Sequence, residues 1–500
     1  MTGKIKKLAG QTAVYGLSSI LGRFLNYLLV PLYTNLFLTS EYGIVTDLYA
    51  YAGFLFVLLT FGTETSFFRY SEKYNKADTV FTAALSPIFI IALIFLFSVI
   101  YFAQPVATFL KYPDHKEYVI WFALIISLDV LSVIPFAKLR RENKALKFAF
   151  FKFINIGLNI GFNLFFLLLC PYLLKHNPDS FVNTFYSENI RIGYIFISNL
   201  IASAVTLLLF IPDFFKIRYR FSKKVTKQLL IYGFPLLFAG LAGMINEVID
   251  RILLKYLIVV PDFVTNTNEY IFSQIGIYGA NYKLSILITL FIQAFRYAAE
   301  PFFFSHQKEK NAKEIYARVM NYFIIFGLTI FLGIMLYIDI AKYFINKNYW
   351  EGLKIVPVLL FANLFLGIVY NLSVWYKLTD KTKFGAYIAG TGAFVTILLN
   401  YILIPKIGYL GSAWATFFCY FTMMIVSYFW GQKHFKINYH LNKIFLYTLI
   451  AVGLFFISQF LNLSGPLKYA VNSVLFFSFV VFAIYKEKII RIKTIRQKIR

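Results

Sequence analysis

The chain has 500 residues, of which 59% are hydrophobic and 14% are charged, and its formal net charge is +26. Soluble globular domains carry about 25% charged residues, so this composition argues against a soluble globular protein. The basic residues lie in short segments between long apolar stretches, which argues against a nucleic-acid partner and favours contact with anionic lipid. We therefore expect a membrane protein whose partners include membrane lipids and no nucleic acid.

Fourteen apolar stretches follow one another along the chain, each about 20 residues or longer, which is enough to cross a bilayer as a helix. The predicted spans are 10–37, 43–67, 79–103, 117–137, 147–173, 190–212, 226–256, 271–305, 315–340, 354–375, 384–405, 409–431, 443–462 and 466–485. The predicted fold is therefore an all-α polytopic membrane protein with 14 transmembrane helices.

Basic residues alternate between the segments that join these stretches. Lys and Arg are abundant from Lys138 to Lys147, from Lys216 to Lys227 and in the tail from Lys486 to Arg500, and every second segment is nearly free of them. Basic residues that flank membrane spans stay in the cytoplasm. The alternation predicts a multi-pass protein of the bacterial inner membrane with both termini cytoplasmic.

A weak internal repeat suggests how the helices are grouped. Tyr-Gly pairs occur in the first, second, seventh and eighth predicted helices, at Tyr15-Gly16, Tyr42-Gly43, Tyr232-Gly233 and Tyr278-Gly279. Six helices separate the two copies, so the copies run in the same direction, a common plan in transporters. We expect an N-lobe at 1–212, a C-lobe at 213–431, two appended helices at 432–485 and a basic cytoplasmic tail at 486–500, with a cavity between the six-helix lobes.

Ionisable and amide side chains interrupt several apolar stretches. A charge at membrane depth costs roughly 2.5–3.5 kcal/mol, so it is expected to face protein or a water-filled cavity. The basic residues that lie away from the ends of the spans are Arg23, Lys152, Arg251, Lys283 and Arg296. If they converge they form a cationic cavity suited to phosphate or diphosphate.

Amide side chains form a regular stripe on the fifth predicted helix. Lys152 is followed by Asn155, Asn159 and Asn163 at helical spacing, and Asn26 lies one turn after Arg23. These amides suit sugar hydroxyls if the stripe lines a cavity. Hydrogen bonding between helices is the alternative explanation.

The seventh predicted helix contains two acids beside Arg251. Glu247 and Arg251 are four residues apart and suited to neutralise each other, which leaves Asp250 in need of a cation, a proton or a bound ion. Arg296 and Glu300 are spaced in the same way, and an internal salt bridge is as good an explanation of either pair as a functional site. Asp250 and Glu247 are our candidates for coupling to H⁺ or Na⁺.

No enzymatic constellation is visible in the sequence. The five His lie in loops or at span ends, away from Cys and acids at metal-ligand spacing, and the phosphate-binding loop of ATPases is missing. We expect no catalytic residues, no cofactor and no metal centre, and therefore a protein that is not an enzyme.

Several segments resemble the polysaccharide and O-antigen flippases (Wzx-type) of the multidrug/oligosaccharidyl-lipid/polysaccharide exporter superfamily. The segments are Pro31–Leu36, Glu41–Gly43, Phe61–Tyr70, Tyr232–Pro235, Asp250-Arg251 and, most specifically, Asn400–Thr416. The resemblance implies two six-helix lobes around a cationic cavity that opens alternately to each side. It also implies a substrate built on polyprenyl diphosphate with an attached oligosaccharide. Related lipid flippases bind sodium between helices 7, 11 and 12, where Asp250, Asn400 and Thr416 are the candidates here.

These observations favour a flippase for a lipid-linked oligosaccharide, the repeat unit of a polysaccharide or lipopolysaccharide O-antigen. Its further partners would be the polysaccharide polymerase and chain-length machinery. A small-molecule or multidrug antiporter of the same superfamily is one alternative, although the basic excess within the spans argues against cationic drugs. A membrane-embedded polysaccharide polymerase or ligase is another, but such enzymes need a sizeable outer loop.

Overall fold

The computed structural model describes residues 15, 16, 18, 20–74 and 77–487, and these residues form helices without any strand. Thirteen helices in this part are long and apolar enough to cross a membrane, and each overlaps one of the stretches predicted after the first. The first predicted stretch lies partly outside the described residues; its described part is helical and ends with α2. The prediction of an all-α polytopic membrane protein is confirmed.

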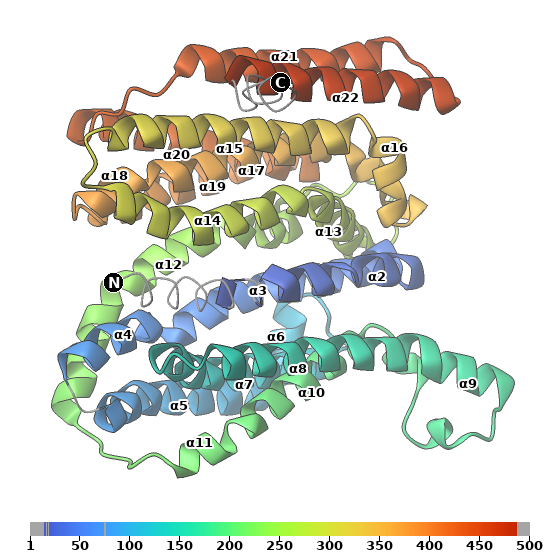
Figure 1. Ribbon diagram of the computed structural model, residues 1–500. Helices are drawn as coiled ribbons and strands as arrows, with labels where there is room; N and C mark the ends of the chain where they lie inside the picture. Colours follow the sequence, from blue (N-terminus) through green and yellow to red (C-terminus); the bar gives the residue numbers. More distant parts are fainter. Residues whose placement is uncertain (1–14, 17, 19, 75–76, 488–500) are drawn as a thin grey trace, which may run out of the picture. The chain divides into compact units, whose positions relative to one another are not determined.

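The chain divides into two compact units, coloured mainly blue to green and yellow to red in Figure 1. Unit 1 consists of the described part of residues 1–279 together with Thr396–Ser412. Unit 2 consists of Ala280–Val395 and the described part of residues 413–500. These units reflect compactness, so the division into an N-lobe and a C-lobe stays a prediction. The predicted tail lies almost entirely outside the described residues.

Unit 1 is built around α7, the helix with the largest buried share of its apolar segment. It contacts α3, α4, α5, α6, α8 and α10. The helices that belong to unit 1 in whole or large part are α2 (Val30–Leu36), α3 (Thr39–Thr60), α4 (Thr63–Lys73), α5 (Ala77–Tyr101), α6 (Ala103–Phe109), α7 (Lys116–Arg141), α8 (Ala145–Leu164), the π-helical η1 (Phe165–Leu169), α9 (Cys170–His176), α10 (Gly193–Leu209), α11 (Ile211–Phe215), α12 (Lys223–Leu257) and α13 (Thr267–Leu284).

Apolar side chains on the outer surface of unit 1 explain why its helices need a bilayer. On α5, Phe89, Ile94 and Phe97 are 49%, 61% and 65% exposed. A soluble protein would bury such a run, whereas lipid tails solvate it at no cost. The backbone polar groups are bonded within each helix, as the absence of water in the hydrocarbon requires.

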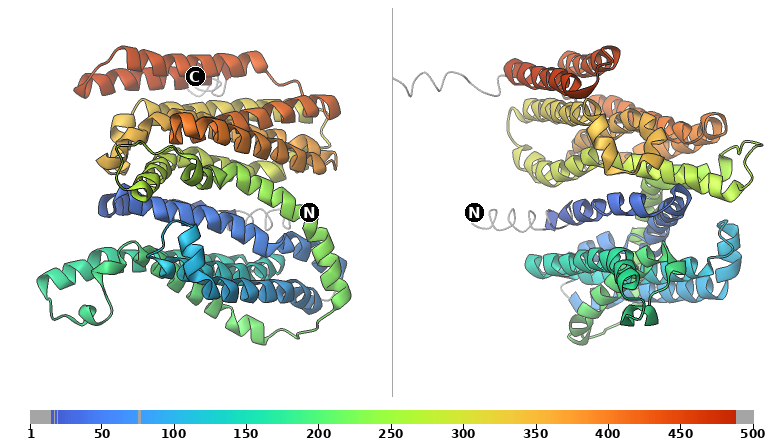
Figure 2. Two further views of the ribbon diagram at one scale, coloured as in Figure 1. Left: turned by 180° about the vertical axis from the view of Figure 1, so that it is seen from behind. Right: turned by 90° about the vertical axis from the view of Figure 1, so that its right-hand side faces the viewer.

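Unit 2 contains the remaining helices, except that the second half of α19 and the start of α20 lie in the Thr396–Ser412 segment of unit 1. They are α14 (Ile286–His306), α15 (Ala312–Met335), α16 (Ile338–Ala341), the 3₁₀ segments η4 (Lys342–Phe344) and η5 (Lys347–Ile355), α17 (Val356–Leu372), α18 (Val374–Leu378), α19 (Lys383–Ile407), α20 (Tyr409–His434), α21 (Leu441–Phe460) and α22 (Gly465–Glu487). The last two form a hairpin that packs on α15, and Figures 1 and 2 show them side by side.

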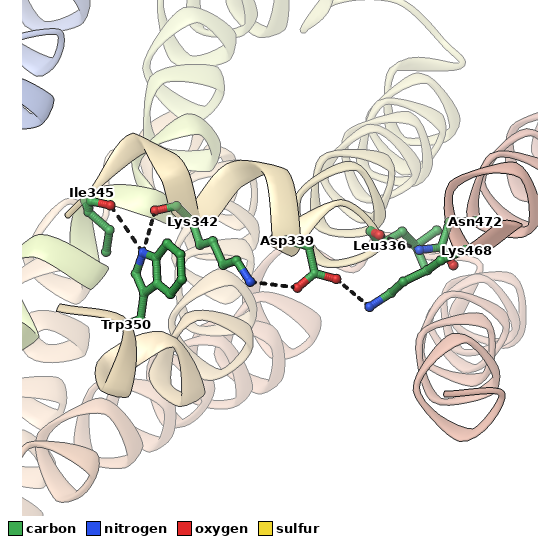
Figure 3. Close-up of polar contacts among 7 residues, drawn as sticks. All are labelled: Leu336, Asp339, Lys342, Ile345, Trp350, Lys468 and Asn472. Carbon is green, nitrogen blue, oxygen red and sulfur yellow. Dashed lines mark hydrogen bonds and ion pairs between the residues drawn. The ribbon is translucent and has the colours of Figure 1, made fainter. Parts of the chain in front are cut away.

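Polar contacts hold the α21–α22 hairpin together and join it to the rest of unit 2. Ser458 donates to Asn472 across the hairpin at 2.7 Å. At the other contact, shown in Figure 3, Lys468 of α22 pairs with Asp339 of α16, and Asn472 donates to the carbonyl of Leu336. Such bonds stabilise helix packing in lipid, where apolar burial alone gives little drive.

Candidate functional site

Within unit 1, the helical residues 20–27 and α2 lie alongside α8. Asn26 accepts a hydrogen bond of 3.1 Å from Asn159, and Tyr33 donates to Asn163 at 2.9 Å. Gly22 lies against Ile156, so along these contacts the residue numbers of both segments increase in the same direction. The two helices therefore run in the same direction, as predicted for the first and fifth membrane helices.

Arg23 and Lys152 lie on these two parallel helices. Arg23 is exposed, and it precedes Asn26 by three residues, so the two share a helix face. Lys152 is half-buried, with its ammonium 4.3 Å from the centre of the Phe136 ring on α7. A cation over an aromatic face is partly stabilised without a carboxylate partner.

The amide stripe of α8 makes hydrogen bonds to neighbouring helices. Asn155 donates to Thr206 of α10 at 2.9 Å, and Asn163 is fully buried and donates to the backbone of Asn159 at 2.7 Å. Asn26 is exposed, and Asn155 and Asn159 are half-buried. Part of the stripe is therefore committed to helix–helix bonding, while these three amides keep accessible surface.

On α12, Asp250 is buried and both of its oxygens are engaged. Oδ1 accepts from the backbone N–H of Arg251 at 2.8 Å and lies 3.4 Å from the Arg251 guanidinium, and Oδ2 accepts from the hydroxyl of Tyr278. Arg251 also donates to the backbone carbonyl of Glu247 at 2.7 Å, whereas the Glu247 side chain is exposed. The carboxylate beside the Arg251 guanidinium is thus that of Asp250, the preceding residue in the chain.

Buried amide and hydroxyl groups lie one turn from Asp250. Thr396 donates to Asn246 at 3.5 Å, and Asn400 donates to the backbone of Thr396 at 2.8 Å. The side-chain oxygen of Asn400 is buried without a hydrogen-bond partner among the described residues. Because Gly408 lies against Ile258 further along, α12 and this part of α19 run parallel, which puts Asn400 level with Asp250. Thr416 is buried in unit 2.

The two predicted cations of unit 2 are Lys283, which is half-buried, and Arg296, which is exposed. The Arg296 guanidinium lies 4.1 Å from the centre of the Tyr370 ring. A pocket on unit 2 is lined by Arg296, Glu300, Tyr370 and Lys377 among others, and Glu300 pairs with Lys377 at 2.9 Å. The acid expected to pair with Arg296 thus has a lysine of α18 as a partner.

One charged pair of unit 1 was missed by the sequence analysis. Asp47 of α3 and Lys255 of α12 lie 2.6 Å apart, and both side chains are 0% exposed. The available signals were Asp47, an acid in the predicted span 43–67, and Lys255, next to the end of the predicted span 226–256. Among the described residues, no group of three or more His, Cys, Asp or Glu side chains could hold a metal ion.

Comparisons with known proteins agree with this architecture. A family model described as polysaccharide biosynthesis protein matches residues 8–307, more than half of the chain. An uncharacterized membrane protein of Methanocaldococcus jannaschii is 24% identical over 520 aligned positions, which cover 96% of this chain and 95% of that protein.

Two kinds of solved structure share the fold. Lipid II flippase MurJ in an inward closed conformation matches with a TM-score of 0.73 and 15% identity, covering 96% of this chain and 99% of that one. An outward-facing multidrug resistance MATE family transporter of the MOP superfamily matches with a TM-score of 0.59 and 15% identity, covering 86% and 94%. The expectation of a transport protein rather than an enzyme agrees with these matches. The chain belongs to the polysaccharide biosynthesis protein family and has the fold of the flippases and transporters of the MOP superfamily.

Proposed function

We propose that this protein is a flippase that moves a polyprenyl-diphosphate-linked oligosaccharide from the cytoplasmic to the outer face of a bacterial inner membrane by alternating access. The observation that carries the proposal is a polar line in unit 1, formed by Arg23, Asn26, Lys152, Asn155 and Asn159. Within it Asn159 donates to the exposed Asn26. Side chains of this kind are costly in lipid unless they face protein or a polar substrate.

The residues of the polar line divide by chemistry. Arg23 offers a bidentate fork for a diphosphate oxygen pair, and Lys152 adds a compact charge. Asn26, Asn155 and Asn159 offer donors and acceptors to sugar hydroxyls. In this assignment Asn163 holds the side chain of Tyr33 and does not contact the glycan. Asn163 and Tyr33 are both buried and are hydrogen-bonded to each other. The diphosphate role of Arg251, Lys283 and Arg296 stays a prediction.

Coupling to sodium or protons is also part of the proposal. Asp250 and the unpartnered oxygen of Asn400 supply the hard oxygen ligands that Na⁺ accepts. The Arg251 guanidinium beside Asp250 opposes a cation there, since it already compensates the carboxylate. The arrangement therefore fits a weak cation site better than a tight one. Glu247 and Thr416 stay predicted members of the coupling site.

The proposal is tested in a strain from which this chain has been deleted, by quantifying lipid-linked intermediates on each face of the inner membrane. Complete repeat units trapped on the cytoplasmic side, and released by re-expression, are the expected result. Repeat units that reach the outer face but fail to polymerise or become attached would instead indicate a polymerase or ligase. No change in either pool, with no other flippase present, would favour the small-molecule antiporter.

Arg23→Gln tests the substrate role of the arginine in the same strain. We expect transport to fall at least tenfold at an unchanged protein level, because glutamine keeps the polar contact but loses the charge-assisted pair. Arg318→Gln is the matched control, since Arg318 is exposed on α15 in an ion pair with Glu314. Equal transport by both variants would remove Arg23 from the site.

A further inference from the structure

The buried pair of Asp47 and Lys255 has no part in the function proposed above. Lys255 Nζ lies 2.6 Å from Asp47 Oδ2, and neither side chain is exposed. Asp47 lies eight residues into α3, about 12 Å from its start. Lys255 lies in the last turn of α12. The antiparallel packing of α3 and α12 brings together two charges that are 208 residues apart in the sequence.

Aromatic rings surround the ammonium group of Lys255. Its Nζ lies 4.6 Å from the centre of the Tyr51 ring, 5.3 Å from Tyr256, 5.7 Å from Tyr112 and 5.9 Å from Phe272. The attraction of a cation to an aromatic face is largest where water is excluded. The lysine is therefore held as a cation by the rings as well as by the carboxylate.

The carboxylate of Asp47 is only half satisfied. Oδ2 accepts from Lys255, but Oδ1 has no hydrogen-bond partner among the described residues, and neither has the nearby hydroxyl of Tyr112. Buried polar atoms without partners are rare because each loses its bonds to water without replacement. An unpartnered oxygen on a buried carboxylate is a place where a proton adds without breaking an existing bond.

We propose that Asp47 is a proton-binding site of this protein. A proton from water adds at Oδ1 and forms an O–H bond, while Lys255 stays an ammonium ion and its hydrogen bond passes to the carbonyl-type Oδ2. The net charge of the pair rises from zero to +1, and the aromatic rings stabilise the remaining cation. No other group has to lose or gain a proton.

Among the described residues, the other titratable groups around the pair are one lysine and three tyrosines. Lys111, after α6, donates to the carbonyl of Lys255 at 3.3 Å and opposes the extra positive charge. Tyr51, Tyr112 and Tyr256 are neutral at ordinary pH. On α13 the group that faces the ammonium is the apolar ring of Phe272. Lys111 is thus the one charge among them that works against protonation.

Two further acids lie on helices that pack against α3. Asp250, on α12, has both oxygens hydrogen-bonded. Asp129 of α7 interacts with Tyr49 of α3, two residues away from Asp47. The predicted topology puts the Asp47 end of α3 toward the outer face, so the proton would enter from that side.

Protonation converts an ion pair between α3 and α12 into a weaker hydrogen bond, which loosens the contact between these helices. A role of this loosening in transport rests on the proposed flippase function. Proton binding itself does not, since it is a property of the protein without substrate.

Infrared difference spectroscopy on the purified full chain in lipid vesicles tests proton binding directly. Acidification from about pH 8 to about pH 4 is expected to produce the carbonyl band of a buried carboxylic acid. The band should be lost in Asp47→Asn and in the double variant Asp47→Asn/Lys255→Met, which removes both charges and so protects folding. Asp129→Asn is the matched control and should keep the band, because it removes a different acid from α7, another helix that packs against α3.

Each result decides the proposal. Loss of the band in both Asp47 variants but not in Asp129→Asn supports the proposal. A band that persists in the Asp47 variants, or disappears in Asp129→Asn instead, overturns it. The same holds if the wild-type protein shows no such band in this range. Substrate is absent from the experiment, so a failed flippase proposal leaves the result unaffected.

Discussion

In unit 2, the carboxylate of Asp339 joins segments that are distant in the sequence. Asp339 of α16 pairs with Lys342 at 3.2 Å and with Lys468, 129 residues later on α22 (Figure 3). The ammonium of Lys342 makes a second contact, since it lies 4.6 Å from the centre of the Trp350 ring. These residues fasten the last helical hairpin to the end of α15.

The pH dependence of this contact follows from the pKa of Asp339. The hydrogen bond from Lys468, and then that from Lys342, holds the pKa of the carboxyl below its ordinary value of 3.8. Because the folded-state pKa is the lower one, the stabilisation is present above the ordinary value and is lost as the pH falls through the folded value. The carboxylate is 34% exposed, so its contribution is about 1 kcal/mol or less after solvent screening.

Asp339→Asn should therefore lower the melting temperature by a few degrees at neutral pH. The difference from the wild-type protein should shrink toward zero as the pH falls below about 4, where the wild-type carboxyl is also neutral. Thermal unfolding in detergent at a series of pH values measures this. Asp262→Asn, in the exposed segment after α12, serves as the control, and a difference that is constant with pH would contradict the assignment.

Pairs of helices in unit 1 approach each other most closely where glycine replaces a side chain. A Cβ atom at Gly43 of α3 would lie 1.8 Å from the carbonyl oxygen of Phe272 on α13, and one at Gly276 would lie 1.9 Å from that of Thr39. Small residues allow this approach in membranes, where packing rather than water expulsion drives association. Gly43 and Gly279 both belong to the Tyr-Gly pairs, so close packing gives these glycines a structural reason beside the proposed repeat.

Gly43→Ala is expected to destabilise the protein by about 1–3 kcal/mol, because backbone has to move to accept even one methyl group. Gly157→Ala on α8 is the matched substitution, since nothing lies within 4 Å of its added Cβ. Alanine is the better helix former there, so that variant should be unchanged or slightly more stable. Fluorescence-detected size-exclusion after heating compares the two, and equal loss of folded protein would count against the close crossing.

At the scale of the whole molecule, the distribution of basic charge predicts which segments face the cytoplasm. The segment between α12 and α13 contains no Lys or Arg, whereas the one between α14 and α15 contains Lys308 and Lys310. Basic segments resist translocation, so the two should lie on opposite faces of the membrane.

Cysteine labelling in intact cells tests this topology. Both native cysteines, Cys170 and Cys419, are buried, which keeps the background low. A membrane-impermeant thiol reagent should modify Asp262→Cys but should modify Lys310→Cys only after the cells are opened. Labelling of Lys310→Cys from outside would reverse the predicted orientation while leaving the helical fold intact.

Much of the architecture could be predicted because a bilayer imposes local rules. Length and apolarity were enough to locate each helix from the second to the last, since every span must bond its own backbone in lipid. The eighth span shows the limit: it was predicted as one helix over 271–305, and it is divided at Ser285 into α13 and α14. Ser285 bonds the carbonyl of Tyr282 at 2.7 Å and accepts from Asn363, which is distant in the sequence.

The candidate site was predictable in its residue types but not in its pairings. Helical periodicity put Asn155, Asn159 and Asn163 on one face of α8, as the geometry of any α-helix requires. It carried no information on which amide meets Thr206, which meets Asn26 and which is buried against Tyr33. In the same way, four-residue spacing suggested Glu247 as the partner of Arg251, whereas the carboxylate that lies beside the Arg251 guanidinium is that of Asp250.

By itself the sequence determined the helical class, the positions of the spans, the predicted topology and the polar residues that lie within lipid depth. All of these follow from local hydrophobicity and charge, which act residue by residue between water and hydrocarbon. Only the tertiary structure decided that Asp47 meets Lys255, that Asp339 holds Lys468 and that Gly43 lies against Phe272. Such contacts join residues that are far apart in the chain, and their partners are selected by how whole helices pack, which no local pattern records.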